Sequence, residues 1–82
     1  MNVENIVKDL LQGATARGDA QQWQADTLLL GHVAELDSMA IVTFFTALED
    51  DHGVFIDDDE VSAELFETLS SLTAFVSKKL AA

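Results

Sequence analysis

Residues 36–53 read LDSMAIVTFFTALEDDHG and carry the start, the body and the end of one helix. Asp37 can cap the first free amides of a helix, and Gly53 suits the left-handed position that closes one. The stretch therefore predicts a helix that opens at 37–38 and closes at 52–53. At about 100° per residue, the apolar side chains on one face form a core-facing stripe. They are Ile41, Phe44, Phe45 and Leu48.

Two further segments have an apolar residue at every third or fourth position, as on the buried face of a helix. Near the N-terminus the pattern predicts a helix over about residues 2–12, with Gly13 as its stop. Near the C-terminus, Ser70 and Ser71 are candidate caps, and the lysines at 78–79 would face the negative end of a helix dipole. The core residues expected from these two segments are Ile6, Leu10, Phe75 and Val76.

The connections between the helices have weaker signals. Residues 13–36 form a stretch longer than a structureless loop in a compact domain, so we expect Trp23 and the leucines at 28–30 to pin it. A short helix can begin near Asp19, and residues 57–65 can hold one helical turn or remain a loop. No segment has the length and pairing of a strand.

Together these elements predict an all-α fold of three main helices plus a short extra helix, with a long loop after the first helix. A chain of 82 residues is long enough for one small core, so we expect a single domain over residues 1–82. The 49% hydrophobic share excludes a disordered acidic tail.

Acidic residues outnumber basic ones by 15 to 4, which gives a net charge of −11. Such a charge repels phosphate backbones and anionic membranes, so nucleic acid and direct membrane insertion are excluded, and basic protein surfaces are favoured as partners. The chain has no cysteine, which excludes disulfides, thiolate metal sites and cysteine nucleophiles. The N-terminus lacks the features of a signal peptide, and we expect a monomer in the cytoplasm.

The sequence does not match the motifs of common enzymes or metal sites. Ser38 is not part of a Gly-x-Ser-x-Gly turn, and His32 and His52 each stand alone. A calcium loop that began at Asp57 would place Ser62 where glycine belongs and a threonine where the closing glutamate belongs. The sequence therefore predicts neither a catalytic centre nor a specific metal site.

Ser38 is the residue whose position suits a chemical modification. A phosphate on its hydroxyl would sit against free backbone amides and the positive end of the helix dipole. The position suits a phosphorylated or phosphodiester-linked serine, and it equally suits a serine that only helps to cap the helix. The local signal does not separate the two interpretations.

The same stretch resembles the acyl carrier and peptidyl carrier proteins. These are small acidic helical bundles that bear a 4′-phosphopantetheine arm on the serine of an Asp-Ser-Leu or Asp-Ser-Met motif. Residues 36–39 match that motif, and 41–56 resemble the family's second helix, its acidic end and the entry to its third. The resemblance covers about residues 3–80. It implies the acyl-carrier-like bundle, no enzymatic activity, and attachment of the arm at Ser38, flanked by Asp37 and Met39.

The resemblance also implies the partners. A separate phosphopantetheinyl transferase would move the arm from coenzyme A to Ser38, using magnesium held largely by that enzyme. The carrier would then hold acyl or aminoacyl groups as thioesters, received from a loading ligase and passed to acyl-transferring enzymes with basic surfaces, for example in lipid or polyketide biosynthesis. A cysteine-free chain agrees with this role, because only the arm could supply the thiol.

The distribution of charge suggests a surface for such partners. No Lys or Arg lies between Gly18 and Ser77. On the second helix we expect acids on the side away from the core, beside an apolar anchor next to the serine. The candidate partner-binding residues are Met39, Val42, Glu49, Asp50 and Asp58. The alternative function is an unmodified acidic helical adaptor that binds a basic protein through the same acids.

Overall fold

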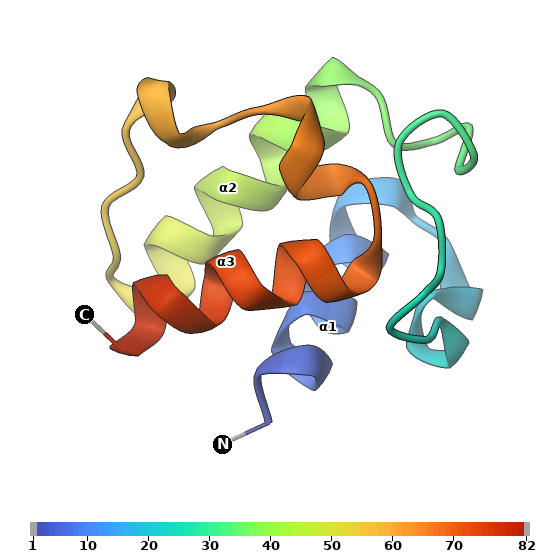
Figure 1. The fold of residues 1–82 in the computed structure, drawn as a ribbon, viewed down its shortest axis with the longest axis horizontal. Coiled ribbons are helices and arrows are strands. Elements are labelled where there is room, and N and C mark those ends of the chain that lie inside the picture. Colours follow the sequence, from blue (N-terminus) through green and yellow to red (C-terminus); the bar gives the residue numbers. More distant parts are fainter. Residues whose placement is uncertain (1, 82) are drawn as a thin grey trace.

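The computed structural model describes residues 2–81, except for the side chain of Asp58. Three α-helices form the body of the molecule (Figure 1): α1 (Val3–Thr15), α2 (Ser38–His52) and α3 (Leu69–Ala81). Three short 3₁₀ turns lie in the connections: η1 (Gly18–Gln22), η2 (Asp58–Glu60) and η3 (Ala63–Phe66). Within the described residues β structure is limited to one isolated bridge, between Leu28 and Thr68. The prediction of an all-α fold with three main helices is confirmed.

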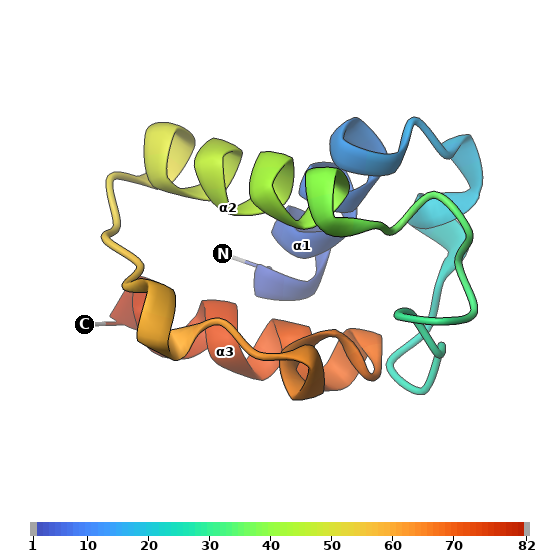
Figure 2. The same cartoon turned by 90° about the horizontal axis from the view of Figure 1, so that it is seen from above.

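The helix α1 packs against both α2 and α3, and Figure 2 shows α2 and α3 on opposite sides of the molecule. A first connection, residues 16–37, closes the end of the bundle at which α2 begins. A second connection, residues 53–62, closes the other end, beside the C-terminal turn of α3 (Figures 1 and 2). Each end of α2 therefore faces a different connection.

The predicted bounds of α2 are confirmed by its caps. The Asp37 carboxylate accepts a hydrogen bond from the amide of Ala40 at 2.9 Å, and Gly53 closes the helix with φ 67°. The first helix is longer than predicted: Gly13 is not its stop, because α1 continues to Thr15 and ends where Ala16 adopts φ 59°.

The third helix also begins earlier than predicted. The hydroxyl of Thr68 accepts from the amide of Ser71 at 3.1 Å, and the Ser71 hydroxyl accepts from the amide of Thr68 at 3.1 Å. This reciprocal pair makes Thr68 the cap in place of Ser70. Lys78 and Lys79 lie in the last turn, as predicted.

The first connection is pinned by a different set of side chains from the one expected. Leu29 is fully buried and Trp23 packs against the core, as predicted, but Leu28 is 47% exposed. Leu28 faces outward because the backbone is extended there, and neighbouring side chains in extended backbone point to opposite sides. Further buried residues of this connection were not expected from the sequence; they are Ala20, Val33 and Leu36.

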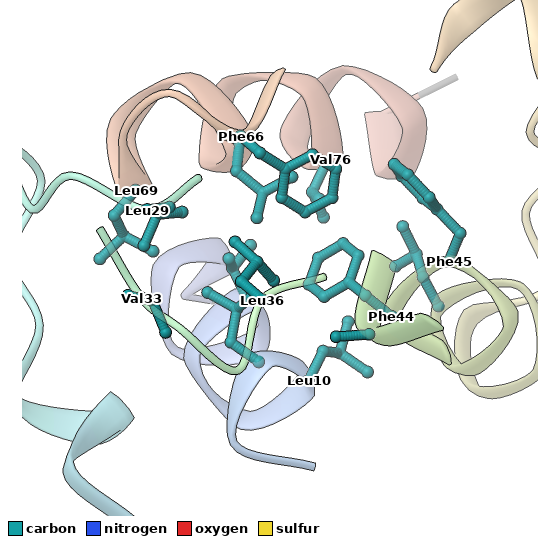
Figure 3. Close-up of a cluster of buried hydrophobic side chains, with 14 of the residues drawn as sticks. Leu10, Leu29, Val33, Leu36, Phe44, Phe45, Phe66, Leu69 and Val76 are labelled. Atoms are coloured by element: carbon teal, nitrogen blue, oxygen red, sulfur yellow. The ribbon is translucent and has the colours of Figure 1, made fainter. Parts of the chain in front are cut away.

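Aromatic rings fill the centre of the bundle (Figure 3). Phe45 meets Phe44 at 5.4 Å between ring centroids, Phe66 at 5.5 Å and Phe75 at 5.9 Å, in each case edge to face. Phe44 and Phe66 also meet edge to face, at 5.8 Å. These contacts join α2, η3 and α3 through their side chains. Of the core residues expected from the sequence, Ile6, Ile41 and Phe75 are only partly buried.

None of the helices in residues 2–81 combines the length and the apolar character needed to cross a membrane.

Candidate functional site

Ser38 is the first residue of α2, and its side chain is exposed. The Asp37 side chain takes the amide of Ala40, and the Asp37 carbonyl accepts from the amide of Ile41 at 3.0 Å. The amides of Ser38 and Met39 precede these two bonded positions, in the turn where a helix has no internal carbonyl to offer. An oxyanion on the Ser38 hydroxyl would therefore lie beside unbonded amides and the positive end of the helix dipole.

The first connection fixes the place of Ser38. Leu36, two residues before the serine, is buried, and Val33 is buried one turn earlier. Arg17, near the start of this connection, forms an ion pair with Glu35 near its end, at 3.0 Å. The same guanidinium lies 2.7 Å from the carboxylate of Asp19. The hydrogen bonds from Arg17 lower the pKa of both carboxyls and raise the pKa of the guanidinium. The serine thus follows a segment held by burial and by ion pairs.

Two large apolar side chains stand exposed within about one turn of the serine. Met39 is 72% exposed and Val42 58% exposed, on the side of α2 away from the core. Their placement agrees with the position that the helix periodicity predicts beside the core stripe. The sequence interpretation missed Phe55, which is 70% exposed in the second connection. Phe55 lies between two other apolar residues, Val54 and Ile56, so the sequence does not indicate which of the three faces water.

An open groove of about 400 Å³ runs beside α2 toward the second connection. Its lining residues come from both segments and are mostly apolar: Ile41, Val42, Phe45, Thr46, Glu49, Ile56 and Val61. Glu49 is half-buried there, and its Oε2 accepts a hydrogen bond from the amide of Ile56 at 3.2 Å. Part of this carboxylate therefore holds the second connection against α2.

The other predicted partner-binding acids lie in different surroundings. Asp50 is exposed on α2, one residue after the half-buried Glu49. The side chain of Asp58 lies outside the described residues. Nearby, Lys79 Nζ lies 2.5 Å from the Glu60 carboxylate, a hydrogen bond that lowers the pKa of Glu60. The structure thus places Met39, Val42 and Asp50 together on the exposed side of α2, with Glu49 turned toward the groove.

Neither histidine belongs to a metal-binding group among the side chains that the structure describes. His32 and His52 are both exposed, in different parts of the chain. Among residues 2–81, the side chains described include no group of three His, Asp or Glu that could hold a metal ion. The exposed serine at the start of α2 is the feature that remains to be explained.

No family model and no curated protein sequence matches the chain. Among solved structures, the chain is similar to a solution NMR structure of a holo acyl carrier protein from Nitrosomonas europaea. The two are 42% identical in sequence, the similarity covers 100% of both chains, and the TM-score is 0.88. The chain belongs to the acyl carrier protein family. An acyl carrier protein is a carrier and not an enzyme, which agrees with the absence of catalytic motifs from the sequence.

Acyl carrier proteins bear 4′-phosphopantetheine as their prosthetic group. The start of α2 in this carrier fits such a group. Ser38 offers an exposed hydroxyl for a phosphodiester, Met39 beside it is exposed, and the unbonded amides of this turn can face the phosphate. The connection before the serine holds this end of α2 in place through the buried Val33 and Leu36 and the ion pair between Arg17 and Glu35.

Proposed function

We propose that this acyl carrier protein bears its 4′-phosphopantetheine arm on Ser38. The observation that carries the proposal is the cap of α2. Asp37 accepts hydrogen bonds from the amides of Ala40 and Ile41, and the amides of Ser38 and Met39 come before these bonded positions, beside an exposed hydroxyl. A phosphodiester at this position is stabilised by hydrogen bonds and by the helix dipole.

When bound, the arm supplies the thiol on which acyl or aminoacyl groups are held as thioesters. The chain's own residues position that arm. Leu36 anchors the backbone before the serine in the core, and Asp37 keeps the first turn of α2 formed. We expect Asp37 and Met39 to contact the phosphopantetheinyl transferase that takes the arm from coenzyme A.

The partners of the loaded carrier are expected to be loading ligases and acyl-transferring enzymes with basic surfaces. Met39 and Val42 supply an exposed apolar contact next to the arm, and Asp50 supplies an acid two turns further along α2. An apolar centre with a charged rim is typical of transient interfaces. Glu49 and Asp58 complete the proposed acidic rim, although one oxygen of Glu49 is already bonded to Ile56.

The test is the intact mass of the protein after incubation with coenzyme A, magnesium and a promiscuous phosphopantetheinyl transferase. We expect the parent protein to gain one phosphopantetheine group and Ser38→Ala to gain none. Ser70→Ala is the matched control, because Ser70 is also an exposed serine in the first turn of a helix, and this variant should be modified like the parent.

Two outcomes would contradict the proposal. Modification of Ser38→Ala would place the arm on another residue. A folded parent protein that gains no mass with several transferases would instead favour the unmodified adaptor, which binds a basic partner whether or not Ser38 is present.

A further inference from the structure

The guanidinium of Arg17 binds acids at both ends of the first connection. Its Nε and Nη2 donate to the two carboxylate oxygens of Asp19, at 3.0 Å and 2.7 Å. The remaining nitrogen, Nη1, donates to Oε1 of Glu35 at 3.0 Å. The guanidinium carbon also lies 5.9 Å from the ring centroid of Trp23, which itself packs against the core. We call these four residues the Arg17 clasp.

The clasp uses the planar shape of the guanidinium. Asp19 binds one edge of the group with both of its oxygens, which fixes the plane and directs Nη1 toward Glu35. A lysine supplies a single ammonium on a flexible stem, so it could not hold both acids in this geometry. Positions 9–77 contain no other Lys or Arg that could take over the pairing. The clasp therefore depends on Arg17.

Glu35 lies in the turn that leads directly to Ser38. On either side of it, Val33 and Leu36 are buried, and the amide of Leu36 donates to the carbonyl of Val33 at 3.0 Å. Figure 3 shows Val33 and Leu36 within the cluster of buried side chains. Burial holds the inner side of this turn, whereas the ion pair with Arg17 holds its exposed side at Glu35. The clasp thus restrains the backbone three residues before the serine.

We infer that Arg17 is a positioning residue for the modification of Ser38, because its clasp holds the turn before the serine in the position that the phosphopantetheinyl transferase binds. The inference rests on the proposed attachment of the arm at Ser38. In that step the Ser38 oxygen bonds to the phosphorus that carries the pantetheine, the pyrophosphate bond of coenzyme A breaks, adenosine 3′,5′-bisphosphate leaves and the serine proton is released. Arg17 acts through Glu35 and not on these atoms, so it affects binding of the carrier and not the chemical step.

The test is the steady-state kinetics of a phosphopantetheinyl transferase with the carrier as the varied substrate and coenzyme A in excess. We expect Arg17→Gln to raise the KM for the carrier about two- to fivefold, the range that an exposed ion pair can supply, with kcat unchanged. Lys8→Gln is the matched control, because it removes the same charge from an ion pair with Glu4 in α1, and its KM should equal that of the parent. An unchanged KM in Arg17→Gln, even with a lower melting temperature, would overturn the inference, and so would an equal rise in Lys8→Gln.

Two further variants test whether Arg17 acts through Glu35. Glu35→Gln should raise the KM by a factor similar to that of Arg17→Gln, and the double variant should raise it no further than either single change does. Independent effects that multiply in the double variant would contradict a shared mechanism. Arg17→Lys keeps the charge but loses the fork, so its KM should stay close to that of Arg17→Gln. Full recovery of the parent KM in Arg17→Lys would assign the effect to charge alone and overturn the positioning role.

Hydrogen exchange in the carrier by itself locates the effect. In Arg17→Gln the amide of Leu36 should exchange faster by a larger factor than the amide of Leu48 inside α2, because the bond from Leu36 to Val33 lies in the turn that the clasp holds. Equal acceleration at the two amides would indicate a general loss of stability and contradict the inference. Intact mass distinguishes the two levels of failure. A parent protein that gains no phosphopantetheine fails the proposed function, whereas a modified parent whose KM does not respond to Arg17→Gln fails only this inference.

Discussion

The two connections at the ends of α2 are held by different forces. The first connection, residues 16–37, buries Leu29, Val33 and Leu36 and makes backbone hydrogen bonds to the start of α3. The second connection, residues 53–62, buries only Ile56 among its described side chains. It is held by two polar contacts: Glu49 accepts from the Ile56 amide, and Lys79 pairs with Glu60 in the turn η2. The proposed attachment site thus follows the firmly packed segment, and one wall of the groove belongs to the loosely packed one.

This difference fits the two tasks. A serine proposed to receive the arm benefits from a fixed position, whereas a groove wall that a binding partner would contact benefits from a low cost of adjustment. The following predictions test the comparison, beginning with the largest expected effect.

A substitution at a buried residue of the first connection should lower the free energy of unfolding the most. Leu29→Ala removes a fully buried side chain and should lower the free energy of unfolding by about 2–5 kcal/mol, measured by urea denaturation. Leu28→Ala, at the exposed neighbouring position, is the control and should change it by less than about 0.5 kcal/mol. Equal effects of the two variants would mean that the connection is not pinned through Leu29.

Loss of a polar contact to the second connection should lower the free energy of unfolding by a smaller amount. Glu49→Ala removes the acceptor of the Ile56 amide and should lower the free energy of unfolding by about 1 kcal/mol. Glu49→Gln keeps a side-chain oxygen that can accept the same bond, so it should remain closer to the parent. A loss in Glu49→Ala as large as that in Leu29→Ala would contradict the difference between the connections.

The ion pair between Lys79 and Glu60 gives the second connection a pH dependence. The pKa of Glu60 is lowered in the folded state, so the stabilisation is present above the unfolded value of about 4.3 and is lost as the pH falls through the folded value. Lys79→Met should therefore melt below the parent at pH 7, and the difference should shrink as the pH falls through the lowered pKa of Glu60. Lys78→Met, at an exposed neighbour, is the control. A difference that persists at low pH would assign the loss to the cation–π contact between Lys79 Nζ and the Phe75 ring, which lie 5.8 Å apart.

Salt should have the smallest and most widespread effect. The net charge of −11 opposes the compact state, and raising the ionic strength from about 0.01 M to 0.15 M shortens the screening length from about 30 Å to about 8 Å. We expect a modest rise in melting temperature with salt or magnesium. Hydrogen exchange should slow more at residues 54–61, which lie among exposed acids, than at 27–36. An unchanged melting temperature would contradict this prediction.

The sequence predicted the parts of the fold that depend on neighbours along the chain. The cap at Asp37, the closing Gly53 and the core stripe of α2 were all predicted, because a helix repeats every 3.6 residues and its ends need defined residue types. The prediction failed at Gly13, where the periodic pattern is uninterrupted and the glycine is tolerated inside α1 at the helix surface. It also failed to choose between Leu28 and Leu29, since both are equally apolar.

The candidate site also has one part that the sequence could predict and one part that it could not. Its serine could be found from the sequence, because the motif and the helix start are contiguous in residues 36–39. The groove could not, since Phe45 and Ile56 come from separate segments and meet only when the second connection folds back on α2. The bond between Glu49 and the Ile56 amide was missed for the same reason, and an acid expected to face a partner is partly engaged within the chain.

By itself, the sequence determined the three helices, the acidic surface and the place of Ser38 at the start of α2, because these follow from local periodicity, capping and charge. Only the tertiary structure decided that four phenyl rings close the interior behind the groove and that the two connections differ in how firmly they are held. Such contacts join residues that are distant in the chain, and no local pattern specifies which side chains meet across a core.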